Sequence, residues 1–147
     1  MSQTITTIFF DLGDTLVDQS KEWVAGAKTT LAAARSKGIR LGIISNTGNL
    51  SRNQVLDLLP ADFDFSRFEA GLVILSSEVG HEKPAKEIFE LAVAKAGING
   101  SDCLYCSENL IETLAAQHVG MRAARVLASD ADIKALIPRL IAGGLLT

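Results

Sequence analysis

Short apolar runs alternate along the chain with longer segments whose apolar residues recur at helical spacing. In the short runs the apolar residues are nearly continuous, which is typical of parallel strands buried on both faces. We expect five such strands, at residues 5–10, 41–44, 72–75, 103–106 and 121–126.

The longer segments carry the start and stop signals of helices. Gly38 closes the first helix and Ser51 caps the second, while Pro84 stands where a first helical residue would. Pro138 either kinks or ends the last helix. The helices are expected at residues 21–37, 51–59, 84–96, 110–118 and 129–137.

This alternation of strands and helices predicts an α/β fold. Because crossovers between parallel strands are right-handed, the elements should form a Rossmann-like, doubly wound parallel sheet of about five strands with helices on both faces. No internal repeat or linker divides the sequence, so we expect one domain over residues 1–147. Ligands bind such sheets beyond the carboxyl ends of the strands, which is where we look for chemistry.

The composition narrows the class of protein. Of the 147 residues, 48% are hydrophobic and 21% are charged, a balance that excludes an intrinsically disordered chain. No apolar run approaches the roughly 20 residues that cross a bilayer, and no export signal is evident, so we expect a cytoplasmic protein without membrane contact. The net charge is −3 and the basic residues are scattered, which gives no nucleic-acid signature.

The two cysteines form a C-x-x-C sequence, Cys103 to Cys106, which in other proteins is a redox motif. Here the motif falls on a predicted strand, where side chains three residues apart point to opposite faces. Redox pairs instead lie at a helix N-terminus, whose dipole lowers the thiol pKa. We therefore interpret both cysteines as structural.

Polar side chains stand where the predicted strands end. Asp11 follows the first strand, Ser45 the second, and Glu108 and Glu112 the fourth, while Lys83 directly precedes a helix. Carboxylate oxygens suit Mg²⁺, and a hydroxyl and a lysine can hold phosphate oxygens. A carboxylate beside the phosphorus could attack it and form an aspartyl-phosphate. The pattern indicates a phosphoryl site beside a divalent cation, although the two glutamates also fit a solvated helix face.

These residues lie in four motifs that resemble those of the haloacid dehalogenase-like (HAD) superfamily of hydrolases. The motifs are residues 10–16 (FDLGDTL), 43–46 (IISN), 80–84 (GHEKP) and 107–112 (SENLIE). Their order matches the family over roughly residues 5–126. The resemblance implies a Rossmann-like core and a Mg²⁺-dependent phosphatase.

The resemblance also implies roles for the matching acidic positions. Asp11 would be the nucleophile and a Mg²⁺ ligand, and the carbonyl of Gly13 would be a second ligand. Glu108 and Glu112 would take the place of the acidic pair that anchors the metal.

The remaining matched positions would serve the phosphoryl group. Ser45 and Asn46 would bind it, and Lys83 would bind substrate and balance the charge of nucleophile and phosphate. Residues 12–44 and 46–82 are too few to hold a cap domain besides the core elements. The site should therefore be open, unless an oligomeric partner covers it, and should accept a phosphorylated small molecule or an exposed macromolecular phosphate.

Two motifs depart from the family pattern. Phosphatases of the family usually carry D-L-D-G-T, whereas this chain reads D-L-G-D-T, so the usual acid/base aspartate is replaced by Gly13. Such acid–base help is worth about 10²–10⁴ in rate. Asp14 either supplies it, through the freedom of the preceding glycine, or points away. In the fourth motif Ser107 and Glu108 replace Gly-Asp, and a shifted alignment would put Ser107 at the metal-ligand position.

The motifs favour a Mg²⁺-dependent phosphomonoester hydrolase acting through an aspartyl-phosphate at Asp11. The alternative is a catalytically impaired domain of the same fold that binds a phospho-ligand or a protein. A receiver domain would need an aspartate after the third strand, where Ser76 and Ser77 stand, and neither Gly-rich nucleotide fingerprint occurs.

Overall fold

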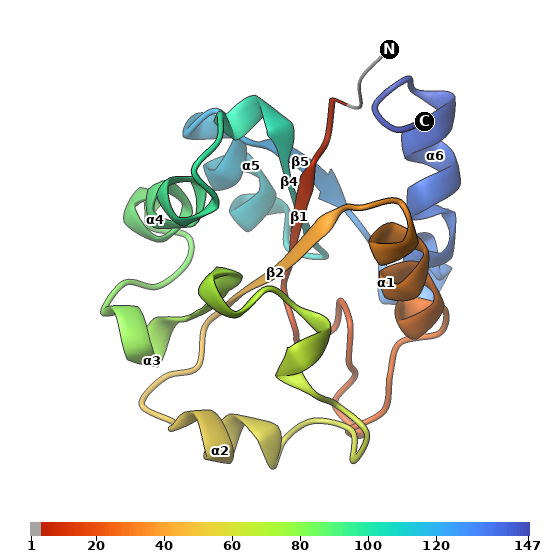
Figure 1. Ribbon diagram of the computed structural model, residues 1–147. Coiled ribbons are helices and arrows are strands. Elements are labelled where there is room, and N and C mark those ends of the chain that lie inside the picture. Colours follow the sequence, from red (N-terminus) through yellow and green to blue (C-terminus); the bar gives the residue numbers. More distant parts are fainter. Residues whose placement is uncertain (1–3) are drawn as a thin grey trace.

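The computed structural model describes residues 4–147 and contains a five-stranded parallel sheet (Figure 1). Its order is β3-β2-β1-β4-β5. This arrangement confirms the expected doubly wound sheet and places the carboxyl ends of β1 and β4 side by side. The strands are β1 Thr7–Phe10, β2 Arg40–Ser45, β3 Val73–Leu75, β4 Cys103–Ser107 and β5 Arg122–Arg125.

Helices cover both faces of the sheet. The helices α1 and α6 pack together on one face, and α4 and α5 pack together on the other (Figure 1). Within the described part of the chain, no helix combines the length and apolar character that a membrane span requires. The α-helices are α1 Ala27–Ser36, α2 Arg52–Leu56, α3 Ser76–Val79, α4 Lys86–Ala96, α5 Leu110–His118 and α6 Leu136–Ala142.

Alternate strand residues supply two apolar cores, one on each face. Phe9, Ile44 and Tyr105 lie in the core beneath α4 and α5, whereas Ile8 and Ile43 lie in the core beneath α1 and α6. Because β1, β3 and β4 are buried on both faces along their whole length, their sequences are mostly apolar, whereas the edge strand β5 is partly exposed and carries an arginine at each end. This is the physical reason that the strands could be recognised as continuous apolar runs.

The intervals between the central strands add no further domain above the strand ends. Between β1 and β2 the chain forms a loop and α1, and between β2 and β3 it forms α2 and two short 3-10 turns. Ser51 caps α2 as expected, since its side-chain oxygen accepts the Gln54 N–H at 3.2 Å.

The first helix is shorter than predicted and begins at Ala27, because residues 21–26 form a loop. Trp23 lies in this loop, where its ring stacks on Phe63 with centroids 5.3 Å apart. The indole N–H also donates to Asp62 at 2.7 Å. A tertiary contact, rather than a helix face, thus explains the apolar residue at this position.

Both proline predictions were wrong. Helix α4 begins at Lys86, and Pro84 follows Lys83 through a cis peptide in the preceding turn. Residues 128–135 form two 3-10 turns instead of the expected helix start, and α6 runs from Leu136 to Ala142. Pro138 therefore lies in the first turn of α6, where a backbone N–H has no partner within the helix.

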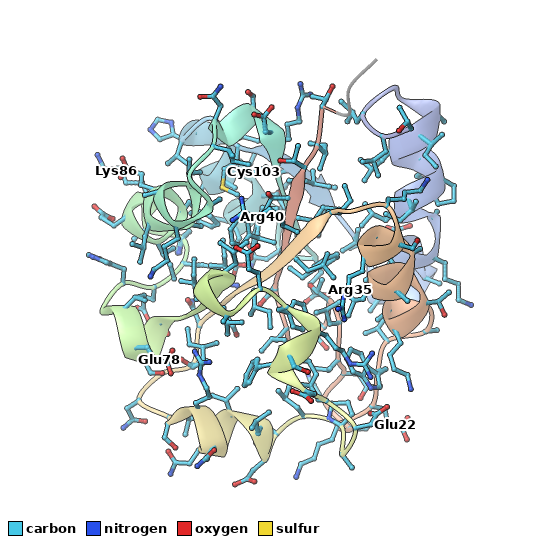
Figure 2. The ribbon with its side chains drawn as sticks, in the orientation of Figure 1. Glu22, Arg35, Arg40, Glu78, Lys86 and Cys103 are labelled. Atoms are coloured by element: carbon cyan, nitrogen blue, oxygen red, sulfur yellow. The ribbon has the colours of Figure 1, made fainter. Side chains whose placement is uncertain are left out.

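The two cysteines are buried on opposite faces of the sheet. Cys103 belongs to the α4–α5 core and Cys106 to the α1–α6 core, and both are free thiols. Burial raises the pKa of Cys103 to about 11 despite the nearby guanidinium of Arg40 (Figure 2). Burial likewise raises the pKa of Cys106. The geometry confirms the structural interpretation of the C-x-x-C sequence.

Candidate active site

A carboxylate and a buried lysine meet at the carboxyl end of the central strand. Asp11 directly follows β1, and its Oδ1 lies 2.8 Å from the Lys83 Nζ. The same Oδ1 accepts the N–H of Leu12 at 2.8 Å. The Lys83 side chain is only 1% exposed, whereas that of Asp11 is 14% exposed. The Lys83 ammonium is therefore shielded from solvent, while the Asp11 carboxylate remains partly accessible to a ligand.

Lys83 is held from its other side by Glu112. The ammonium lies 2.9 Å from Glu112 Oε1 and donates to the Tyr105 hydroxyl at 3.0 Å. The Tyr105 hydroxyl in turn donates to Glu112 Oε1 at 2.7 Å. Two carboxylates and a phenol thus fix the position of one buried charge.

Ser107 joins the two carboxylates. Its hydroxyl lies 3.3 Å from Asp11 Oδ2 and 3.3 Å from Glu112 Oε1, and it accepts the N–H of Asn109 at 3.1 Å. The long contact to Asp11 Oδ2 leaves this oxygen more loosely held than Oδ1, which has two short partners. Oδ2 is therefore the less engaged oxygen of the carboxylate.

The local sequence explains how β4 and α5 aim these groups. Tyr105 and Ser107 are two residues apart on β4, so their side chains leave the same face of the sheet. Asn109 caps α5, with its Oδ1 accepting the N–H of Glu112 at 3.0 Å. Glu112 consequently sits in the first turn of α5, where the helix dipole favours a negative charge.

Burial and like charges shift the pKa values of two carboxyl groups. The pKa of Asp11 is raised, because burial and the charge of Glu112 outweigh the opposing attraction of Lys83. The pKa of Glu108 is also raised, by burial first and then by the charges of Asp14, Asp11 and Glu112, while the guanidinium of Arg125 opposes the shift. Four carboxylates therefore repel one another around this end of the sheet.

The predicted metal ligands are near one another but are not assembled. Among residues 4–147, no three His, Cys, Asp or Glu side chains are grouped so as to hold a metal ion. Glu108 is held through its backbone, with its N–H donating to Thr15 at 3.3 Å and its carbonyl accepting from Arg125 at 2.7 Å. The donor chemistry nevertheless fits Mg²⁺, since the group supplies hard oxygens and an excess of negative charge.

Asn46 and Ser45 have different surroundings. The Asn46 side chain forms two hydrogen bonds with the backbone of Lys83: its Nδ2 donates to the carbonyl at 2.9 Å, and its Oδ1 accepts the N–H at 2.8 Å. The amide therefore positions the lysine, and its predicted contact with substrate stays a prediction. Ser45 is buried at the end of β2, and its hydroxyl has no hydrogen-bond partner among the residues that the structure describes.

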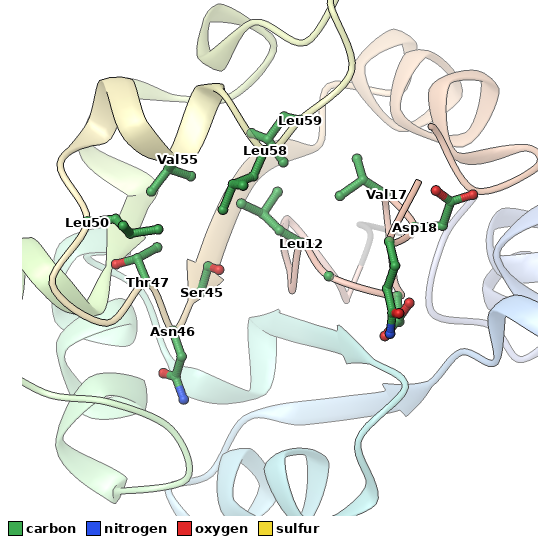
Figure 3. Close-up of a pocket in the computed structure, with 13 residues that line it drawn as sticks. Leu12, Val17, Asp18, Ser45, Asn46, Thr47, Leu50, Val55, Leu58 and Leu59 are labelled. Atoms are coloured by element: carbon green, nitrogen blue, oxygen red, sulfur yellow. The ribbon is translucent and has the colours of Figure 1, made fainter. Parts of the chain in front are cut away.

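Asp14 adopts a backbone conformation that is unusual for a non-glycine residue, with φ at +58°. Together with Leu12 and Gly13, it lines a cavity that opens beside the strand ends (Figure 3). Ser45, the last residue of β2, and Asn46, which follows it, line the same cavity. The structure thus places the predicted acid/base residue in the wall of a cavity that begins at Leu12, the residue after Asp11.

Sequence reasoning missed two polar residues at this end of the sheet. Tyr105 passed as one more apolar strand residue, although a tyrosine hydroxyl that is fully buried needs a polar partner. Thr47 was not singled out, yet its hydroxyl donates to Ser77 at 2.7 Å and its N–H donates to Ser76 at 2.8 Å. These bonds tie the segment after β2 to the start of α3. For Tyr105 the available signal was a hydroxyl two residues before the end of a central strand.

Comparison with known proteins agrees with this geometry. The sequence model of the haloacid dehalogenase-like hydrolases matches residues 24–120. No curated protein sequence matches the chain.

Three solved structures share the fold at low sequence identity. A predicted HAD-like family hydrolase from Porphyromonas gingivalis is 18% identical, with a TM-score of 0.73 over 94% of this chain and 98% of that one. A predicted phosphoglycolate phosphatase from Haemophilus somnus is 12% identical, with a TM-score of 0.69 over 95% and 99%. A HAD family enzyme from Bacteroides thetaiotaomicron, in complex with magnesium and inorganic phosphate, is 16% identical, with a TM-score of 0.66 over 84% and 95%.

Proposed function

Because the chain belongs to the haloacid dehalogenase-like hydrolases, we propose that it hydrolyses phosphomonoesters through an aspartyl-phosphate at Asp11. One observation carries the proposal: the Asp11 carboxylate stands at the end of β1 with Lys83 fixed 2.8 Å from one of its oxygens, while the other oxygen has only a long contact, 3.3 Å, with the Ser107 hydroxyl. A lysine in this place neutralises the charge that accumulates when a carboxylate approaches a phosphate dianion.

The reaction has two steps. In the first, a lone pair of Asp11 Oδ2 attacks phosphorus, the bond between phosphorus and the ester oxygen breaks, and the alcohol leaves after taking up a proton. In the second, water attacks the phosphorus of the acyl phosphate, which releases inorganic phosphate and restores the carboxylate. Lys83 stays in place throughout, held by Glu112 and Tyr105.

Asp14 is the proposed donor of the proton. It directly follows Gly13 and lines the cavity beside Asp11, where the leaving alcohol would lie. A group in this place can protonate the alcohol in the first step and take a proton from water in the second.

Mg²⁺ is the proposed cofactor, and Asp11, the carbonyl of Gly13 and Glu108 would hold it. When bound, the ion supplies positive charge to the phosphoryl oxygens. The magnesium and inorganic phosphate in the Bacteroides thetaiotaomicron relative support this assignment. Glu112, which the sequence suggested as a fourth ligand, is proposed to position Lys83 instead, because its Oε1 already accepts from Lys83 and Tyr105.

The test is turnover of a phosphomonoester panel with Mg²⁺ by the purified protein and by Asp11→Asn. We expect turnover by the natural protein and none by the variant, and radiolabelled phosphate from the substrate should be trapped on the former only. Asp130→Asn is the matched control, because Asp130 is exposed and distant in sequence from every motif. Equal turnover by both variants would exclude Asp11 as the nucleophile.

The second candidate is a phospho-ligand-binding domain without turnover. It is favoured by the exchange of Gly13 and Asp14 relative to the family pattern and by the unassembled metal ligands. No turnover across the panel, together with phosphate binding that Lys83→Met abolishes, would establish this alternative.

A further inference from the structure

The cavity beside the strand ends is apolar over most of its wall. It has a volume of about 230 Å³ and lies between the loop that follows β1 and the segment that follows β2 (Figure 3). The side chains from the two segments face one another across it. Its apolar residues are Leu12, Val17, Leu50, Val55, Leu58 and Leu59.

Three of the six polar side chains in this wall are already engaged by the protein, whereas those of Asp14, Gln19 and Ser45 form no hydrogen bond within the part of the chain that the structure describes. The amide of Asn46 binds the backbone of Lys83 and points away from the apolar side chains (Figure 3). The Thr47 hydroxyl donates to Ser77, and the Asp18 carboxylate accepts two backbone N–H groups within its own loop. The hydrogen-bonding groups of these three side chains are therefore already occupied and are less available to a ligand.

The charge of the wall is negative. Asp14 and Asp18 line the cavity, and among the residues that the structure describes no lysine, arginine or histidine does so. An anionic leaving group would therefore meet carboxylates with no cation to balance it. An uncharged alkyl or aryl group would instead bury apolar surface against leucine and valine side chains.

On these grounds we propose that the cavity receives the alcohol part of the substrate and selects phosphomonoesters of small, uncharged, apolar alcohols. The inference rests on the proposed phosphatase function, because it places the leaving group next to Asp14 and the phosphoryl group at Asp11. At about 30 Å³ per water-sized group, the volume accommodates roughly eight non-hydrogen atoms. The segment after β2, which includes α2, would therefore supply most of the apolar side chains that contact the alcohol.

A homologous series of alkyl phosphates tests the proposal, because the reactivity of the leaving group stays constant along it. We expect kcat/KM for hexyl phosphate to exceed that for methyl phosphate about 100-fold. This ratio is below the upper limit for five extra methylenes, because complete burial of each methylene contributes about fourfold, or ~0.8 kcal/mol. The hexyl ester with a terminal carboxylate should lose most of this gain.

Leu58→Lys places a cation at the mouth of the cavity, at a position that is 54% exposed and so should tolerate it. We expect this variant to lower kcat/KM for hexyl phosphate about tenfold and to raise it for the carboxylated ester. Leu114→Lys is the matched control: Leu114 is 51% exposed on α5 and is not part of the cavity wall, so its profile should match the natural protein.

Binding of hexylphosphonate and methylphosphonate, measured by calorimetry, separates failure of the cavity from failure of the enzyme. Turnover that is independent of chain length, or unaffected by Leu58→Lys, would overturn the cavity assignment and leave the phosphatase intact. Absent turnover with tighter binding of hexylphosphonate, lost in Leu58→Lys, would overturn the phosphatase and support the cavity. Absent turnover with equal binding of both phosphonates would overturn both.

Discussion

Removing the charge of Lys83 should cost more stability than any other single change at the candidate site. The ammonium is 1% exposed and lies within 3 Å of a carboxylate oxygen on either side, 2.8 Å to Asp11 and 2.9 Å to Glu112. Lys83→Met keeps the aliphatic stem but leaves two largely buried carboxylates without a counter-charge. Breaking a buried ion pair from one side costs about 3–5 kcal/mol.

The expected loss is large enough for ordinary equilibrium unfolding. In a domain of this size it corresponds to a fall in Tm of about 6–20 °C. Urea unfolding can be followed through the fluorescence of Trp23, the only tryptophan of the chain. We expect the midpoint of Lys83→Met to lie well below that of the natural protein at pH 7.5.

The loss should shrink on acidification. Burial already raises the pKa of Asp11, and Lys83 is the main opposing influence, so the variant should raise it further. A carboxyl whose pKa is raised in the folded state destabilises the fold above its unfolded pKa, and this penalty disappears as the pH falls through the folded pKa. The difference in stability between Lys83→Met and the natural protein should therefore be smaller at pH 5 than at pH 7.5.

Lys86→Met is the control, because Lys86 is exposed on α4 and should change stability by no more than about 0.5 kcal/mol. A loss below about 1 kcal/mol for Lys83→Met, or a loss that is constant with pH, would refute the interpretation of Lys83 as a desolvated counter-charge.

Three further predictions concern single positions. Asp14→Asn should lower kcat for alkyl phosphates about 10²-fold or more and should affect p-nitrophenyl phosphate much less, since that leaving group needs no proton; equal losses would exclude Asp14 as the acid. The hydrogen bond from Trp23 lowers the pKa of Asp62, so Asp62→Asn should reduce Tm at neutral pH, with the deficit vanishing as the pH falls below the usual pKa of 3.8; a deficit that persists there would contradict this account. Gly42→Ala should cost about 1–3 kcal/mol in urea unfolding, because its Cβ would lie 2.6 Å from the Phe9 ring and 2.8 Å from the backbone carbonyl of Leu72, and an unchanged midpoint would show that the turn before β3 and the Phe9 ring can yield.

The strand-end rule explains why the centre of the site could be predicted. Asp11 and Lys83 are far apart in the sequence, yet one follows a central strand and the other precedes a helix that returns to the same edge of the sheet. Backbone topology alone brings such positions together. The continuous apolar runs, in turn, placed the five strands within a few residues of their observed bounds.

The partners of each side chain could not be predicted in the same way. Motif positions assigned Glu112 to metal and Asn46 to substrate, and these roles stay predictions; the contacts of both residues with Lys83 were not foreseen. The contact of the Glu112 carboxylate with the Lys83 ammonium depends on how α5 packs against the turn before α4. No local sequence pattern predicts this packing. Tyr105 was overlooked because an aromatic ring satisfies an apolar pattern whether or not its hydroxyl has a partner.

The pair of hydrogen bonds between Asn46 and the backbone of Lys83 decides where the rim of the sheet tolerates insertions. We expect residues 80–82, between α3 and Lys83, to change in number without moving the ammonium, because the Asn46 amide fixes the Lys83 peptide at the far end of that loop. One extra residue between Ser45 and Asn46 would instead displace the amide by about 3.8 Å, more than the length of the whole ion pair with Asp11. Relatives that keep the buried lysine should therefore have no insertion between Ser45 and Asn46. At this point the number of residues, rather than their type, should stay constant.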